Sequence, residues 1–202
     1  MSTAPRTLLQ HANAPLHPSA LSKSAVIVID AQEEYRSGRL PLAGIEDAIA
    51  TIAELLAVAR QHQAPVFHIL QQGRPGGLFD PETSFARAID ATAAKDGDQI
   101  VVKSLPNAFA KTSLDDLIRA TGRTELIIAG FMTHMCVSAT TRAALDAGYR
   151  STIVADATAT RALPDPLQGG TIAAAELQRN ALAALADRFA IVVRDVAALT
   201  KG

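Results

Sequence analysis

The sequence has few of the residues that cross-link a fold or form large aromatic contacts: among 202 residues it has one cysteine, Cys136, and no tryptophan. A single cysteine cannot form a disulfide within the chain, which excludes the disulfide-rich class of small secreted proteins. A chain of this length can bury most of its apolar surface and fold without a structural metal. We therefore expect one domain of ordinary size in a reducing compartment, the cytoplasm.

An excess of charge of either sign is also missing. Lysine plus arginine number 19 and aspartate plus glutamate 20, so the formal charge is −1. This balance gives no support for nucleic acid or an anionic membrane as a partner. No apolar run approaches the length of a membrane span, and residues 1–22 lack the continuous apolar core of a signal peptide. We predict an extended N-terminal arm over residues 1–22, with a disordered tail as the alternative, and a single domain over residues 23–202.

What the sequence does contain is a series of short apolar runs rich in valine and isoleucine. They are too short for helices, and they lack the alternation of a strand with one wet face, which is typical of parallel strands covered on both sides. The runs are residues 25–29, 65–70, 100–102, 126–129, 152–155 and 190–193.

Segments with helical spacing of apolar residues lie between most of these runs, at residues 45–61, 113–121, 133 or 134 to 147, and 171–188. This alternation predicts an α/β fold, a three-layer αβα sandwich around a doubly wound, mostly parallel six-stranded sheet. Two connections are irregular. Residues 71–99 are turn-rich, with a possible short helix at 85–94, and residues 162–170 precede the last helix; we expect both over the carboxyl edge of the sheet.

Polar residues that end apolar strands carry the chemical information. Asp30 directly follows the first run, Lys103 follows the third, and Cys136 lies a short turn after the fourth, where a helix begins. Because the carboxyl ends of parallel strands share one edge, these three side chains should converge there. A carboxylate can take the thiol proton, an ammonium can stabilise the resulting charges, and the unpaired N–H groups of a helix start favour thiolate. A packed cysteine, a capping aspartate and a solvated lysine remain the alternatives.

Several blocks of sequence together resemble the isochorismatase-like cysteine hydrolases, over about residues 25–193. The blocks are VIDAQ at 28–32, VK at 102–103 with NAF at 107–109, GFMTHMCV at 130–137 and VADA at 154–157. The resemblance implies a Rossmann-like topology and a catalytic triad of Asp30, Lys103 and Cys136. It further implies a cis peptide bond between Phe131 and Met132, with the backbone N–H groups of Met132 and Cys136 forming an oxyanion hole.

Departures from the family narrow the chemistry. The metal-binding branch that cleaves nicotinamide carries an Asp-x-His pair and a further histidine after the second strand, and the corresponding region here has only His68. We interpret His68 as a hydrogen-bonded core residue, and we predict neither a metal nor another cofactor. The presence of Cys136 favours cleavage of a C–N bond in a small amide or ureide through a thioester. The alternatives are a vinyl ether hydrolase, which needs no thiol, and a non-catalytic binder that carries a reactive thiol.

Loops over the same edge supply candidates for binding a small-molecule substrate. We predict this role for Gln32, Tyr35, Phe109, His134 and Gln168. Core packing is the alternative for the two aromatic residues, and an exposed place in the first helical turn is the alternative for His134. Family members usually assemble, so the resemblance also implies a homo-oligomer, a dimer or a tetramer.

Overall fold

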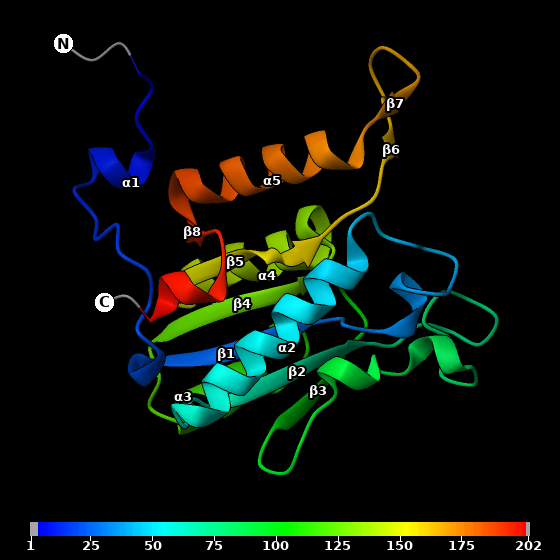
Figure 1. Ribbon diagram of the computed structural model, residues 1–202, viewed down its shortest axis with the longest axis horizontal. Helices are drawn as coiled ribbons and strands as arrows, with labels where there is room; N and C mark the ends of the chain where they lie inside the picture. The colour runs from blue at the N-terminus through cyan, green and yellow to red at the C-terminus, as the bar shows by residue number, and fades with distance from the viewer. Residues whose placement is uncertain (1–3, 201–202) are drawn as a thin grey trace.

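The apolar runs form one parallel sheet. The computed structural model describes residues 4–200, and its main sheet has six strands in the order β3-β2-β1-β4-β5-β8 (Figure 1). All neighbouring strands are parallel, which confirms the predicted doubly wound α/β fold. The strands are β1 Ser24–Ile29, β2 Val66–Gln71, β3 Gln99–Lys103, β4 Glu125–Phe131, β5 Arg150–Ala159 and β8 Ile191–Val193.

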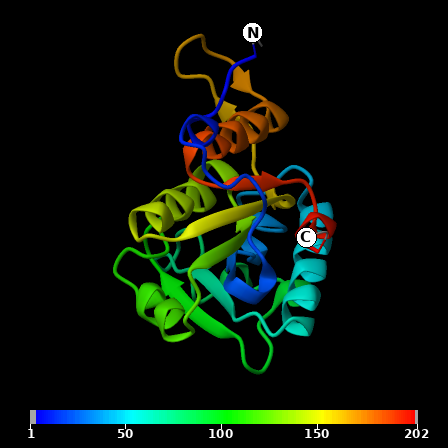
Figure 2. The same cartoon turned by 90° about the vertical axis from the view of Figure 1, so that its left-hand side faces the viewer.

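Helices cover both faces of the sheet and bury one apolar core on each side. Helix α2 (Ile45–Gln61) packs on one face, with the same bounds that its helical spacing predicts. Helices α3 (Leu114–Ala120), α4 (Ser138–Asp146) and α5 (Ala174–Arg188) contribute to the other core. In Figure 2, α2 lies on one side of the sheet and α3 and α4 on the other. Because the central strands are buried on both sides, they show no alternation of polar and apolar residues.

Two predicted helices differ from the structure. The helix expected over residues 171–188 begins at Ala174, because Thr171–Ile172 forms strand β7, which pairs antiparallel with β6 (Leu163–Pro164). This hairpin projects from the body of the molecule beside the start of α5 (Figure 1). The possible helix at residues 85–94 consists of two short 3₁₀ turns, Ser84–Ala86 and Asp90–Thr92.

The N-terminal segment packs against the body of its own domain, at the edge of the sheet where the strands begin (Figure 1). Its short helix α1 (Leu8–His11) contacts α5, and the backbone N–H of Leu8 donates to Asp187 Oδ1 at 2.8 Å. Further along, the backbone N–H of Ser19 donates to Thr152 Oγ1 in β5. The loops that follow the strands gather at the opposite edge. Within residues 4–200, no helix has the length and apolar character needed to cross a membrane.

Candidate active site

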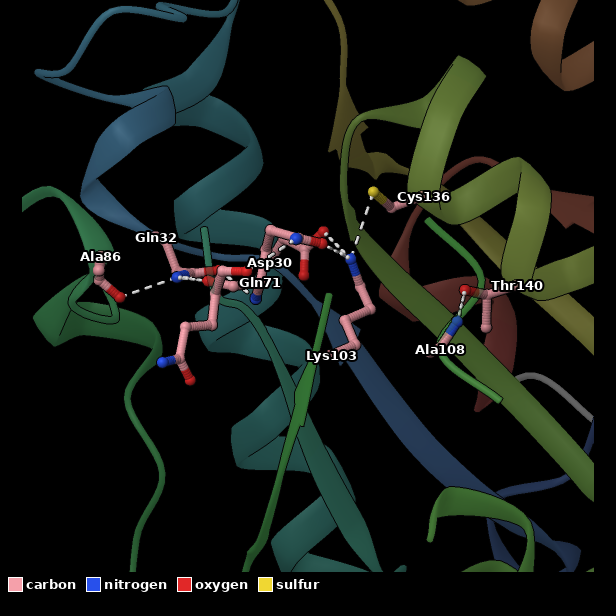
Figure 3. A network of polar contacts seen from close by, with 9 residues as sticks. Asp30, Gln32, Gln71, Ala86, Lys103, Ala108, Cys136 and Thr140 are labelled. Atoms are coloured by element: carbon pink, nitrogen blue, oxygen red, sulfur yellow. Dashed lines mark hydrogen bonds and ion pairs between the residues drawn. The ribbon is translucent and has the colours of Figure 1, made fainter. Parts of the chain in front are cut away.

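The acid, the cation and the thiol meet at the carboxyl edge of the sheet. Lys103 Nζ lies 2.8 Å from Asp30 Oδ2 and 3.4 Å from Cys136 Sγ (Figure 3). All three side chains are buried, with residue exposures of 0% for Asp30, 2% for Lys103 and 5% for Cys136. Three stretches far apart in the sequence therefore place complementary groups within hydrogen-bonding distance.

The backbone around the strand ends is shaped to bring these groups together. Asp30 adopts a left-handed conformation with φ 51°, which an L-residue seldom does without a local reason. Beside it, Gly130 has φ 112°, and a Cβ there would meet the carbonyl oxygen of Ile29 at 2.0 Å. Only glycine lets β4 approach the end of β1 this closely. The peptide bond between Phe131 and Met132 is cis, as the family resemblance implies.

A single π-helical turn positions the cysteine. The turn spans Thr133–Val137 and leads directly into α4. It is closed by the backbone N–H of Val137, which donates to the carbonyl of Met132 at 3.2 Å, and the Thr133 hydroxyl donates to the carbonyl of Ala159 in β5. Cys136 therefore sits on a fixed turn between β4 and α4 rather than on a mobile loop.

Burial favours the protonated thiol of Cys136 and opposes the field of the helix start. Desolvation, followed by the charge of Asp30, raises the pKa of Cys136 to about 12, and Lys103 opposes this shift only in part. The thiol therefore needs a proton acceptor, the role predicted from the sequence for the carboxylate of Asp30. Desolvation also raises the pKa of Asp30, against the opposing effect of Lys103.

Asp30 retains proton-accepting capacity. Its Oδ2 faces Lys103, while its Oδ1 is buried and accepts no hydrogen bond from residues 4–200. A buried carboxylate oxygen without a donor binds a proton more readily than one that is fully hydrogen-bonded. The site can therefore transfer a proton between sulfur and carboxylate beside a fixed ammonium.

A cavity of about 320 Å³ opens onto the sulfur. This volume is at the small end of the range for ligand pockets in proteins. Most of its walls are apolar, and it is lined by Tyr35, Leu40, Gln71, Leu78, Phe79, Ser104, Pro106, Met132, Met135 and Cys136. The dimensions suit a small molecule, and Tyr35, Gln71 and Ser104 supply polar groups to the lining.

Tyr35 lines this cavity, whereas the side chain of Gln32 is hydrogen-bonded to the protein backbone. The Tyr35 ring packs edge-on against Phe79 and Phe131, with centroid distances of 5.2 and 6.0 Å. Burial raises the pKa of its phenol above the usual range, so the hydroxyl stays neutral. The Gln32 side chain is fully buried and bonded to the backbone of Gln71 and Ala86, so it holds loops together and is not available to a substrate.

The remaining three predicted pocket residues lie outside the cavity lining. Phe109 stacks on Tyr149 at a centroid distance of 5.9 Å and packs against the core, as the packing alternative has it. His134 Nδ1 lies 2.5 Å from Thr160 Oγ1, and burial, with the charge of Arg161, lowers the pKa of its imidazole. Gln168 is exposed in the β6–β7 turn, because that segment forms a projecting hairpin and not a loop over the site.

Gln71 is a site residue that was not predicted from the sequence. It ends β2, lines the cavity, and its Oε1 accepts a hydrogen bond from Lys103 Nζ at 2.7 Å (Figure 3). Its position in the sequence could have indicated this role, because Gln71 directly follows the second apolar run, just as Asp30 and Lys103 follow the first and third runs.

His68 is a buried core residue whose Nε2 lies 3.1 Å from Asp98 Oδ2, as expected from its place in an apolar strand. Across residues 4–200, no group of three or more histidine, cysteine, aspartate or glutamate side chains is arranged to hold a metal ion.

Comparisons with known proteins agree with this architecture. Residues 24–195 match the isochorismatase domain model. A solved isochorismatase structure from Pseudomonas putida KT2440 superposes with a TM-score of 0.91 at 40% identity, covering 95% of this chain and 97% of that one. The secreted isochorismatase effector Isc1 of Verticillium dahliae is 32% identical over 89% of this chain and 92% of its own length. The ureidoacrylate amidohydrolase RutB of Stutzerimonas stutzeri is 30% identical over 71% of this chain and 74% of its own.

Proposed function

Because this chain belongs to the isochorismatase family of hydrolases, we propose that it cleaves a C–N bond of a small amide or ureide through a thioester on Cys136. One observation carries the proposal: a buried ammonium, Lys103, lies within hydrogen-bonding distance of both a carboxylate with a raised pKa and the sulfur that lines the cavity. A nucleophile, a base and a charge stabiliser are thereby assembled beside a substrate-sized space.

In the first half of the reaction, Asp30 accepts the proton of the Cys136 thiol as the sulfur attacks the carbonyl carbon. The carbonyl oxygen becomes an oxyanion, which the backbone N–H groups of Met132 and Cys136 stabilise. The protonated Asp30 then gives its proton to the leaving nitrogen, the C–N bond breaks, and ammonia or an amine departs. Lys103 stabilises the carboxylate of Asp30; the negative charge moves from this carboxylate to the oxyanion during the attack and returns to Asp30 when the leaving nitrogen takes the proton.

The second half returns the enzyme to its starting state. Asp30 takes a proton from a water molecule as the water oxygen attacks the thioester carbon. The C–S bond then breaks, and the sulfur recovers a proton from Asp30. The products are a carboxylic or carbamic acid and the free thiol, so each proton removed in the cycle is returned.

Cleavage of a vinyl ether, the reaction of isochorismatases proper, is the second candidate. It is favoured by the relative described as an isochorismatase effector, and it would use Asp30 without the thiol. The position of the sulfur in the cavity wall, in contact with Lys103, favours amide chemistry, because an ether hydrolase has no use for a nucleophile there. A non-catalytic binder would use the thiol alone.

The Cys136→Ala variant separates these functions. The wild-type protein should release ammonia from members of a panel of small amides, ureides and carbamoyl amino acids, and the variant should lose at least about 10⁴-fold in kcat. Its melting temperature should stay close to that of the wild type, since the substitution removes one sulfur atom from a cavity wall. Full amide turnover in the variant would refute the mechanism, and retained ether hydrolysis would favour the second candidate.

We also propose a cytoplasmic location and a homo-oligomeric state, a dimer or a tetramer. The single free cysteine suits a reducing compartment, although one relative is described as secreted. Helix α5 buries only Leu185, and Leu167 in the adjacent hairpin is 91% exposed, so this part of the chain has side chains free to contact another copy. The mass of the native protein in solution tests the assembly.

A further inference from the structure

Every N–H group of the buried Lys103 ammonium has an acceptor. An ammonium has three donors, and Nζ of Lys103 lies 2.8 Å from Asp30 Oδ2, 2.7 Å from Gln71 Oε1 and 3.4 Å from Cys136 Sγ. Asp30 and Cys136 change their protonation during the proposed reaction. Gln71 supplies the only one of the three acceptors that stays the same throughout.

The backbone of Gln71 is held unusually firmly for a strand end. Its N–H donates to Gln32 Oε1 at 2.8 Å, and its carbonyl accepts from Gln32 Nε2 at 2.9 Å. The same Nε2 also donates to the carbonyl of Ala86 at 2.7 Å, and Gln32 is fully buried. Gln71 and Lys103 are register partners on the neighbouring strands β2 and β3. The amide side chain therefore reaches the ammonium from a fixed point (Figure 3).

We propose that Gln71 is a positioning residue, which holds Lys103 between Asp30 and Cys136 while the proton moves between those two groups. The role rests on the proposed cysteine chemistry. The neutral amide suits it, because it satisfies a buried N–H without adding a second negative charge. A carboxylate here would compete with Asp30 for the ammonium and oppose the formation of a thiolate. Gln32 contributes indirectly, because its side chain is hydrogen-bonded to the backbone of Gln71.

The single cysteine offers a readout that needs no substrate. Alkylation by iodoacetamide requires the thiolate, so its rate as a function of pH reports the ionisation of Cys136 alone. Lys103 lowers the pKa of this thiol. If Gln71 acts by positioning Lys103, its loss should lower the thiolate fraction and slow alkylation at a fixed pH, and this effect should require Lys103.

The experiment compares Gln71→Met, Lys103→Met and the double variant, with Gln72→Met as the control, since Gln72 is the exposed neighbour. Methionine matches glutamine in length and lacks the amide acceptor. For Gln71→Met we expect kcat to fall about 10- to 100-fold and the alkylation rate at pH 8 to fall about threefold or more, which corresponds to a rise of about half a unit in the pKa of the thiol. In the Lys103→Met background the same substitution should not lower the alkylation rate further, and Gln72→Met should match the wild type.

If Gln71→Met has the kcat and the alkylation rate of the wild type, the positioning role is wrong. It is also wrong if Gln71→Met lowers the alkylation rate as much in the Lys103→Met background as in the wild type. If Gln71→Met fails to fold, Gln71→Asn takes its place with the same expectations, because its side chain is one methylene too short to reach Nζ. If the wild type hydrolyses no amide, the proposed function fails, while the alkylation data still decide whether Gln71 positions Lys103.

Discussion

At each end of strand β3 lies a cluster of one aspartate with cationic side chains, and the pKa values of the two aspartates shift in opposite directions. Asp98 directly precedes β3, and its Oδ2 accepts from Arg60 Nη2 at 2.6 Å, the Lys95 backbone N–H at 2.9 Å and His68 Nε2 at 3.1 Å. At the other end, Asp30 faces Lys103 through Oδ2 and leaves Oδ1 without a partner among residues 4–200.

The two aspartates consequently differ in proton affinity. Burial raises the pKa of Asp98, but the hydrogen bonds from Arg60, Lys95 and His68 together outweigh it and hold the pKa below its usual value. Burial dominates at Asp30 and raises its pKa despite Lys103. A carboxylate supplied with many donors is fixed as an anion and serves the fold, whereas one short of donors can exchange a proton. Asp30 is fully buried and Asp98 only partly so, and the two sites therefore differ both in burial and in the supply of hydrogen-bond donors.

Removing the proton acceptor at the catalytic end should give the largest effect. We expect Asp30→Asn to lower kcat by about 10³-fold or more, since the side chain can no longer take the thiol proton. The thiol itself should alkylate faster at pH 8, because the charge of Asp30 raises the pKa of Cys136 and is absent in the variant. Steady-state ammonia release and iodoacetamide rates measure the two effects.

The matched change at the other end of β3 should affect stability in place of turnover. Asp98→Ala leaves Arg60 and His68 without their acceptor, so we expect a loss of about 2 kcal/mol in the free energy of unfolding. The kcat should stay within about twofold of the wild type, because no group of this cluster lines the cavity at Cys136. Urea unfolding followed by circular dichroism gives the stability. A large loss of kcat in the folded variant would contradict the division between the two ends.

The sequence predicts some parts of the fold and of the site but not others. The strands of the main sheet and α2 were predictable because short continuous apolar runs and helical spacing of apolar residues are distinct sequence patterns. Asp30, Lys103 and Cys136 could be located because parallel topology brings strand ends to one edge. The hydrogen bonds by which Gln32 holds Gln71 and Ala86 could not be predicted. They depend on the path of residues 71–99, and its short 3₁₀ turns leave no periodic pattern of apolar residues in the sequence. The place of Gln168 followed from the β6–β7 hairpin, which is made of strands of two residues each.

The smallest effect concerns the pH dependence of stability at the Asp98 end. Burial lowers the pKa of His68 in the folded state, and Asp98 opposes the shift only in part. Below about pH 6.5 the unfolded chain binds a proton at this histidine while the folded chain does not, so the folded state loses stability as pH falls. The lowered pKa of Asp98 adds a loss of the same sign at more acidic pH, below about 4.

His68→Gln isolates the histidine contribution, because glutamine retains an N–H donor for Asp98 and does not titrate. We expect the variant to lose less stability than the wild type between pH 7 and pH 5, by a smaller amount than Asp98→Ala costs at pH 7. Urea unfolding at closely spaced pH values provides the measurement. Parallel stability curves for the two proteins would show that His68 is as easily protonated in the folded chain as in the unfolded one, and the hydrogen bond to Asp98 would then have to balance its burial in full.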